Sequence, residues 1–373
     1  MPTVSDLCDV MNDVAPLQHA AEWDNTGLLV GRRDADISTV MVCIDLTSAV
    51  LREAIDADVQ AIVAYHPPLF EPRTRVTGDE PSGELLLGII ESGIAVYSPH
   101  TALDAVPGGM ADWLIEGVGA GDVRPIECAT EQGHAEETLV VTYAPPNALA
   151  PLRDAMAAAG AGQIGEYTHC AAASPSTGTF KGGMNTTPAI GESGVLESVE
   201  ELRLTMACGN AALADVIVAL RQTHPYEEAP VHIVPLQSRP IHNTGMGRLI
   251  QLANERSTQD IVESYKRHLG VSTLRLAEGC HAPSAHTIIG CCPGAGDSML
   301  QAAESAGATL YITGEMRHHD VLAAVERGTT ILLAGHTNTE RGYLPYLQAS
   351  IKESLPTCEV IPSTTDTTPW TNA

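Results

Sequence analysis

Short apolar runs that alternate with helical segments at both ends of the chain are the feature that most limits how it can fold. Runs of this length are typical of buried strands. The segments between the early runs, residues 47–57 and 83–92, suit helices. Strands that alternate with helices predict a βαβ architecture with a mainly parallel, buried sheet, and hence the α/β class. The runs lie at residues 39–45, 60–65 and 94–98 near the start, and at 286–290, 308–314 and 329–335 near the end.

The pattern changes after about residue 125, where a strand, a helix and a strand are followed by the same three elements again. This order is the signature of a split-βαβ, ferredoxin-like domain. A Gly-, Ser-, Thr- and Pro-rich segment at 174–194 separates the two halves and is expected to be a loop or hairpin. The predicted strands are 137–145, 200–208 and 229–236, and the predicted helices are 147–159 and 210–222.

The chain has 373 residues, which is too long for one ordinary domain, so two or three are expected. The simplest account is one α/β domain in two parts, residues 1–128 and 239–373, interrupted by the inserted domain at 129–238. At the amino terminus, residues 5–19 are expected to form a helix capped by Ser5.

The composition excludes several classes of protein. A net charge of −26, from 46 acidic and 20 basic residues, repels nucleic acid backbones, so no nucleic acid partner is expected. The sequence contains no apolar run near the ~20 residues of a membrane span and no secretory signal, so we expect a cytoplasmic protein without membrane contact. The nine cysteines lack a CxxC spacing, which favours reduced thiols over a disulfide framework or a zinc ribbon.

The histidine His336 follows the predicted strand at 329–335 and precedes a predicted helix. Glu340, four residues later, would lie on the same helical face one turn on. Ligands bind at the carboxyl ends of strands in open α/β sheets, so this pair could hold a divalent metal. The alternative is a capping histidine and a surface glutamate paired along the helix.

Two other predicted strands are also followed by residues that commonly bind metals. His66 follows the strand at 60–65 and is held by Pro67 and Pro68, whereas His100 and Asp104 follow the strand at 94–98. Each has a simpler interpretation, as a turn histidine or as an ordinary helix cap. Parallel strands bring their carboxyl ends to one edge of a sheet, however. We therefore expect His66, His100 and Asp104 to lie near His336 and Glu340. Two imidazoles and two carboxylates would form a mixed site suited to Zn, Mn or Fe.

Two further segments follow predicted strands. Glu315, after the strand at 308–312, could act as a general acid or base, or could simply belong to a polar helix start. The glycine-rich segment 290–300 could cradle a phosphate, but it matches neither the Walker nor the dinucleotide-binding pattern, which favours a tight turn.

Taken in order, these motifs resemble those of the GTP cyclohydrolase 1 type 2 family, also called Nif-three-like. The resemblance spans nearly the whole chain, and the middle is similar to the longer members of that family. The motifs that carry it are WDNTGLLVG (23–31), YHPPLF (65–70), YSPHTALDAVPGGM (97–110), TGEMRHHD (313–320) and GHTNTERGYL (335–344), and in the middle GAGQIGEYTHC (160–170), GTF (178–180), IGESG (190–194), HPYEEAPVHIVPL (224–236) and GMGRL (245–249).

The resemblance implies a Nif-three-like two-layer α/β domain interrupted by a ferredoxin-like domain. It implies a toroidal homohexamer with a paired divalent metal site facing an internal cavity. Carried over by motif, the metal ligands are His66, Asp104, His336 and Glu340, with Glu340 as the bridge. His100 and Glu315 match positions near that site and would serve as supporting groups or as the general acid and base.

The chain departs from the family pattern at Tyr65. The common bacterial motif has two successive histidines before proline, and here a tyrosine occupies the first of these positions. Three alternatives follow: Tyr65 supplies a phenolate ligand, water replaces the missing histidine, or only one of two metal ions binds tightly.

The leading functional hypothesis is a divalent-metal-dependent hydrolase that acts on a small, nucleotide-like substrate. If the substrate is GTP, as the family name implies, water attacks C8 of the purine and formate is released. The alternative is a non-catalytic metal-binding scaffold or regulator, in which the inserted domain serves interaction or sensing. Phosphoesterase chemistry at the same metals is a third alternative.

Overall fold

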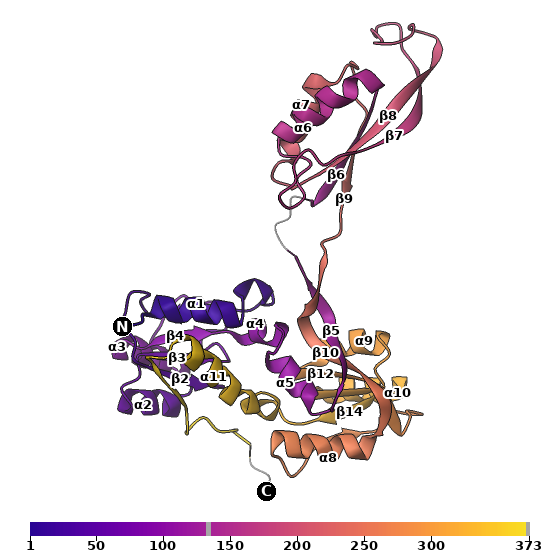
Figure 1. Ribbon diagram of the computed structural model, residues 1–373. Coiled ribbons are helices and arrows are strands. Elements are labelled where there is room, and N and C mark those ends of the chain that lie inside the picture. The colour runs from indigo at the N-terminus through magenta and orange to yellow at the C-terminus, as the bar shows by residue number, and fades with distance from the viewer. Residues whose placement is uncertain (132–135, 371–373) are drawn as a thin grey trace. The chain divides into compact units, whose positions relative to one another are not determined.

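The computed structural model describes residues 1–131 and 136–370 and divides into two compact units (Figure 1). The larger unit combines both ends of the chain, Met1–Ala129 and Ile241–Ala373, and the smaller unit is Thr130–Pro240. A smaller unit is therefore inserted into the sequence of the larger one.

The first sheet of the larger unit has the strand order β1-β4-β3-β2-β15. Its four strands other than β1 run parallel, and β1 pairs with β4 in the antiparallel sense. Side chains alternate between two buried faces: Val40 and Val42 enter one apolar cluster, whereas Met41 and Cys43 enter another. Burial on both faces explains why these strands read as continuous apolar runs. The strands are β1 (Gly27–Val30), β2 (Thr39–Cys43), β3 (Ala61–Ala64), β4 (Ala95–Ser98) and β15 (Glu359–Pro362).

The second sheet has the order β11-β14-β13-β12-β10-β5. Strands β12, β13 and β14 are parallel, and β10 and β11 pair with their neighbours in the antiparallel sense. The chain thus builds two sheets, each with a parallel centre, where the strand pattern alone predicts one mainly parallel sheet. The strands are β5 (Gly121–Thr130), β10 (Pro240–Ser257), β11 (Arg275–Ala277), β12 (Ala285–Ala295), β13 (Leu310–Glu315) and β14 (Thr330–Leu333).

One apolar cluster joins the two sheets. It contains Val63 of β3 together with Ile312 of β13 and Leu332 of β14, and five helices add residues to it. Two helices pack on the other face of the first sheet and two on the other face of the second. The shared helices are α1 (Val4–Val14), α4 (His100–Ala105), α5 (Met110–Glu116), α8 (Thr258–Leu269) and α11 (Leu344–Ser354); the outer ones are α2 (Ser48–Asp56), α3 (Pro81–Ser92), α9 (Leu300–Ser305) and α10 (His318–Arg327).

The cap of the first helix differs from the prediction. The N-cap is Thr3, whose hydroxyl accepts a hydrogen bond from the backbone N–H of Asp6, and Asp6 accepts one from the backbone N–H of Thr3. This reciprocal capping box satisfies two helix-end donors, whereas a start at Ser5 would satisfy fewer. The prediction of a Ser5 cap is therefore wrong by two residues.

The inserted unit has its own four-stranded sheet and its own core. The strand order is β7-β8-β6-β9, all pairs are antiparallel, and the element order is the β–α–β–β–α–β of a ferredoxin-like fold. Strand β7 occupies the start of the segment that the sequence predicts as a loop or hairpin, and β8 follows it. The elements are β6 (Thr138–Ala144), α6 (Leu149–Ala158), β7 (Ala172–Lys181), β8 (Leu196–Cys208), α7 (Leu213–Thr223) and β9 (Val231–Pro235).

The described residues also bear on the cysteines and on the membrane. All nine cysteines are free thiols, as expected for a chain without a disulfide framework. Among residues 1–131 and 136–370, none of the helices has both the length and the apolar character needed to cross a membrane.

Candidate metal centre

The carboxyl ends of parallel strands from both sheets of the larger unit supply the groups of one site. Asp45 follows β2, His66 follows β3 and His100 follows β4 in the first sheet. Glu315 ends β13 and His336 follows β14 in the second sheet. This placement agrees with the general rule that ligands bind beyond the carboxyl ends of such strands.

Three side chains converge closely enough to hold a metal ion: His66, His336 and Glu340. Oε1 of Glu340 lies 3.2 Å from Nε2 of His336 and 3.6 Å from Nε2 of His66. Ligand atoms arranged tetrahedrally at about 2.1 Å from one ion are separated by about 3.4 Å, so these spacings fit a common cation. Glu340 is 1% exposed, and its second oxygen, Oε2, has no hydrogen-bond partner among the described residues. A buried carboxylate oxygen without a donor is the kind of atom that a cation satisfies.

A short 3-10 turn, Thr337–Thr339, connects His336 to Glu340. The sequence predicts a single helix here, with both residues on one face of it. Instead, α11 begins only at Leu344, and the tighter turn brings the two side chains together. The predicted proximity is found, although the local structure that produces it is different.

Each of the three imidazoles near the site is oriented by a carboxylate. A carboxylate only accepts, so each Nδ1 carries the hydrogen and each Nε2 is left for the site. This arrangement is typical of metal-binding histidines, because the carboxylate fixes the ring and increases its basicity. The pairs are His66 with Asp45 at 2.9 Å, His336 with Glu315 at 2.9 Å, and His100 with Asp24 at 2.8 Å.

The charges of the cluster are strongly coupled. Burial lowers the pKa of His66, but hydrogen bonds and charge from Asp45 and Glu340 outweigh it and raise the pKa to about 10. The hydrogen bond to Glu340 raises the pKa of His336 to about 9 against the effect of burial. Burial raises the pKa of Glu340, yet the two histidines hold it below its ordinary value. A cation that binds here competes with protons for both Nε2 atoms.

Asp104 and Tyr65 lie beside this cluster as a buried pair. The Tyr65 hydroxyl donates to Oδ1 of Asp104 at 2.6 Å. Burial raises the pKa of Asp104 to about 6, partly offset by that hydrogen bond and by the charge of His100. Burial and the charges of Asp104 and Glu340 raise the pKa of Tyr65 well above its ordinary value. In this structure Tyr65 is therefore a neutral donor to Asp104, and Asp104 lies outside the tight three-residue cluster.

The sequence analysis missed three residues that shape the site. Asp45 is the last residue of the predicted strand at 39–45, and this position at a strand end is a signal that could have identified it, whereas Asp24 appears only within the motif WDNTGLLVG. Gly294 lies in the glycine-rich segment, with φ at +62°, and its N–H donates to the Thr339 hydroxyl at 2.9 Å. A Cβ on Gly294 would lie 2.7 Å from Oε1 of Glu340, so the glycine leaves room for the cluster. Gly294 thus leaves space for the ligand atoms, which differs from the phosphate cradle and the tight turn considered from the sequence.

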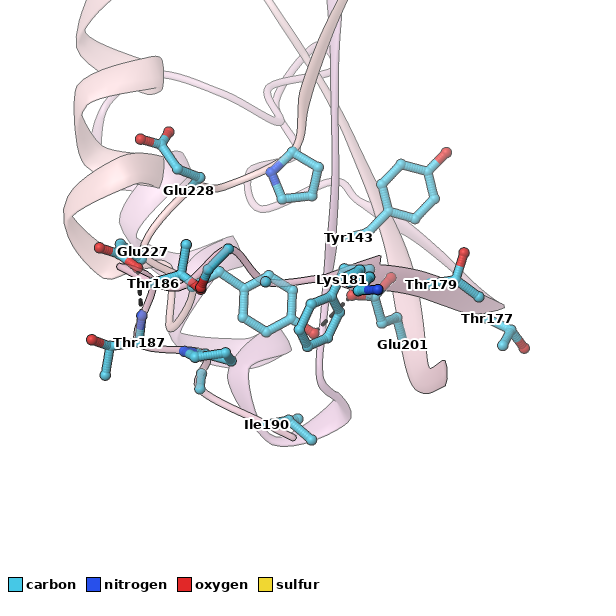
Figure 2. Close-up of a pocket in the computed structure, with 18 of the residues that line it drawn as sticks. Tyr143, Thr177, Thr179, Lys181, Thr186, Thr187, Ile190, Glu201, Glu227 and Glu228 are labelled. Carbon is cyan, nitrogen blue, oxygen red and sulfur yellow. Dashed lines mark hydrogen bonds between the residues drawn. The ribbon is translucent and has the colours of Figure 1, made fainter. Parts of the chain in front are cut away.

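The inserted unit has a separate cavity of about 560 Å³ (Figure 2). Tyr226, Glu227 and Glu228 line part of it, and the Tyr226 hydroxyl donates to Glu201 at 2.7 Å. The neighbouring His224 ring bonds to the Tyr143 carbonyl at 3.0 Å. Among the described residues, the cavity lining contains no group of three potential metal ligands. The group of described residues that could hold a metal ion lies in the larger unit.

The whole chain can now be compared with known proteins. The model of one protein family, described as Duf34/NIF3 (NGG1p interacting factor 3), matches residues 2–369. The chain belongs to the Duf34/NIF3 family. This confirms the resemblance inferred from the motifs, because the Nif-three-like family and Duf34/NIF3 are the same family.

Relatives of this Duf34/NIF3 protein occur in bacteria and in mammals. A protein of Bacillus subtilis named GTP cyclohydrolase 1 type 2 homolog is 32% identical over 368 residues, which cover 98% of this chain and 97% of the relative. NIF3-like protein 1 of Homo sapiens is 34% identical over 376 residues, covering 97% and 90% of the two chains. The solved structure of a Bacillus cereus protein related to NIF3 is 28% identical, covers 100% of this chain and 99% of its own, and gives a TM-score of 0.66.

Proposed function

We propose that this Duf34/NIF3 protein is a divalent-metal-dependent hydrolase acting on a nucleotide-like substrate. One observation carries the proposal: His66 and His336, each oriented by a carboxylate through Nδ1, direct Nε2 toward the buried carboxylate of Glu340. Nitrogen and oxygen ligands of this kind suit Zn, Mn or Fe.

Asp104 extends the proposed ligand set, with Glu340 as the bridge if two ions bind. The two carboxylates influence each other's charge, and Tyr65 bonds one oxygen of Asp104. Of the three alternatives for Tyr65, the hydrogen bond to Asp104 favours a single tightly bound ion or a water in place of the missing histidine. A phenolate ligand would require Tyr65 to give up its hydrogen bond to Asp104.

A bound divalent ion supplies Lewis acidity and lowers the pKa of water, which is the chemistry that hydrolysis requires. The remaining steps belong to side chains of this chain. Glu315, about half exposed and bonded to His336, can accept and return a proton at the open side of the site. His100, held by Asp24, is the second candidate for proton transfer.

The choice of substrate comes from the relatives. The Bacillus subtilis relative is named as a GTP cyclohydrolase 1 type 2 homolog, and for GTP the expected reaction is purine ring opening at C8 with release of formate. The test is to load the full chain with Zn, Mn or Fe, incubate it with GTP and measure formate.

We expect wild-type protein to release formate only when metal is present, and His66→Ala to lose at least about 100-fold in rate, since it removes both a ligand and its orienting pair. An absence of turnover with every metal, in protein that retains stoichiometric metal, would instead support the non-catalytic scaffold. Turnover of phosphate esters without formate release would support the phosphoesterase.

Asp45→Asn tests the orienting carboxylates separately. We expect its metal affinity to fall about 10- to 100-fold, because the neutral amide oxygen is a weaker acceptor for the Nδ1–H of His66 than the charged carboxylate. Asp56→Asn is the matched control, since Asp56 is exposed at the end of α2 and lies away from the cluster. Competition with a metal-binding dye measures both affinities. Equal affinities in the two variants would contradict a positioning role for Asp45.

The homohexamer implied by the family resemblance is part of the same proposal. Light scattering on the purified full chain measures the molar mass directly. A mass of about six chains supports the assembly, and a monomer would exclude it.

A further inference from the structure

Two aromatic side chains are exposed beside the metal cluster. Trp23 is 63% exposed and Phe70 is 51% exposed, and their ring centroids lie 5.9 Å apart. Only 4% of the chain is aromatic, with three Trp and two Phe in total, so two such neighbours in one place are notable. Large apolar side chains are usually buried, and their exposure in pairs commonly marks a binding surface.

The loops that carry these two rings are fixed by hydrogen bonds from neighbouring residues. Asp24, next to Trp23, accepts from His100 at 2.8 Å and from the backbone N–H of Thr101 at 3.1 Å. The Asn25 side chain donates to the Leu69 carbonyl, which ties the Trp23 loop to the loop of Phe70. The two loops that carry the rings are thus tied to each other and to the segment of His100.

The rings also connect directly to the metal cluster. Trp23 and Phe70 each approach the ring of His100 edge-on, at 6.1 and 6.3 Å between centroids. The ring centroids of His100 and His66 are 5.4 Å apart, and those of His66 and His336 are 5.3 Å apart. The two exposed aromatic rings are therefore adjacent to His100, which in turn is adjacent to the candidate metal ligand His66.

We infer that Trp23 and Phe70 form a subsite that stacks the planar heteroaromatic ring of the substrate beside His66, His336 and Glu340. Aromatic side chains stack on every nucleobase because each base has a π-face, and they do so without requiring a positively charged surface. That matters for a chain with a net charge of −26, which repels the phosphates of a nucleotide. The inference rests on the proposed function for its choice of substrate class, and the ring is what this subsite recognises.

The binding step can be measured without metal or turnover. Trp113 is buried, so after Trp370→Phe the exposed tryptophan fluorescence of the full chain comes from Trp23. In the presence of a chelator, this variant is titrated with guanosine, which has a planar ring and no phosphate, and with ribose 5-phosphate, which lacks the ring. We expect guanosine to quench the Trp23 emission and ribose 5-phosphate to leave it unchanged.

Variants then separate stacking from other roles. By calorimetry, Trp23→Ala and Phe70→Ala should each weaken guanosine binding about tenfold or more, while Trp23→Phe, which keeps an aromatic face, should stay within about threefold of the wild type. Exposed Trp370 provides the control, because Trp370→Ala should bind guanosine normally.

Two results would overturn the inference. The first is that the wild type and both alanine variants bind guanosine with the same affinity, or that none of the three binds it. The other is a drop in molar mass of Trp23→Ala by light scattering, which would make the aromatic surface an interface between copies of the chain. Failure of the proposed function would look different. If guanosine binding depends on Trp23 but GTP releases no formate, the proposed reaction is wrong and the proposed subsite stands.

Discussion

Replacing Glu340 with glutamine should remove stoichiometric metal from the protein. Oε1 of Glu340 is the atom shared by both histidines, and the side chain is buried, so water has little access to replace it. An amide keeps the shape but loses the negative charge that a divalent ion requires. We expect the metal affinity to fall by at least about 100-fold. Loss of a residue that only orients a ligand costs up to about that much, and loss of a ligand should cost at least as much.

The measurement is elemental analysis of wild-type and variant proteins after the same dialysis against a weak chelator. Glu353→Gln provides the matched control, because Glu353 is an exposed residue of α11 and the change removes the same charge. The site assignment is wrong if Glu340→Gln retains as much metal as the wild type. Circular dichroism and the melting temperature show whether the variant is folded.

Gly294→Ala should also abolish metal binding, although it changes no ligand. The added methyl group would lie 2.7 Å from Oε1 of Glu340 and 3.1 Å from Nε2 of His336, in the space where their ligand atoms converge. The backbone at Gly294 has φ +62°, so alanine also adds strain of about 1–2 kcal/mol. Backbone strain at residue 294 would lower the stability of the fold, whereas a methyl group between the ligand atoms would prevent metal binding.

Gly270→Ala separates these two effects. Gly270 ends α8 with φ +67°, and a Cβ there would contact nothing within 4 Å. Denaturant unfolding should therefore show the loss of stability caused by backbone strain in both variants, but only Gly294→Ala should fail to bind metal by calorimetry. Equal metal binding in the two glycine variants would show that the space at Gly294 is not needed.

Much of the larger unit was predictable because its parallel strands are buried on both faces. Such strands appear in the sequence as apolar runs, and β2, β3, β4, β12, β13 and β14 lie where those runs are. Some of the strands that the sequence analysis missed lack that signal. The residues of β5, for example, are mostly exposed, and its sequence contains both a proline and charged residues.

The division of the strands between two sheets was not predictable from periodicity. A run of apolar residues shows that a strand is buried but does not name its neighbour, which is set by contacts between distant segments such as Val63 and Leu332 in the shared core. Three of the candidate ligands, His66, His336 and Glu340, nevertheless lie together, because the rule that relates them, the carboxyl ends of parallel strands, holds for both sheets.

The orienting carboxylates illustrate the other limit. Asp24 is far from His100 in the sequence, and the chain gives no local pattern that pairs them. Asp45 ends the apolar run at 39–45, but an aspartate at the end of a strand is common in turns. Their role becomes visible only when hydrogen bonds fix which ring nitrogen faces the site.

Because the cluster takes His66 from the first sheet and His336 with Glu340 from the second, it joins segments from opposite ends of the polypeptide. A ribosome must therefore translate nearly the whole message before the site can assemble, and any product of premature termination upstream of Glu340 lacks it. Contacts of such high order form late in folding. The complete cluster is accordingly a feature of the finished, folded chain.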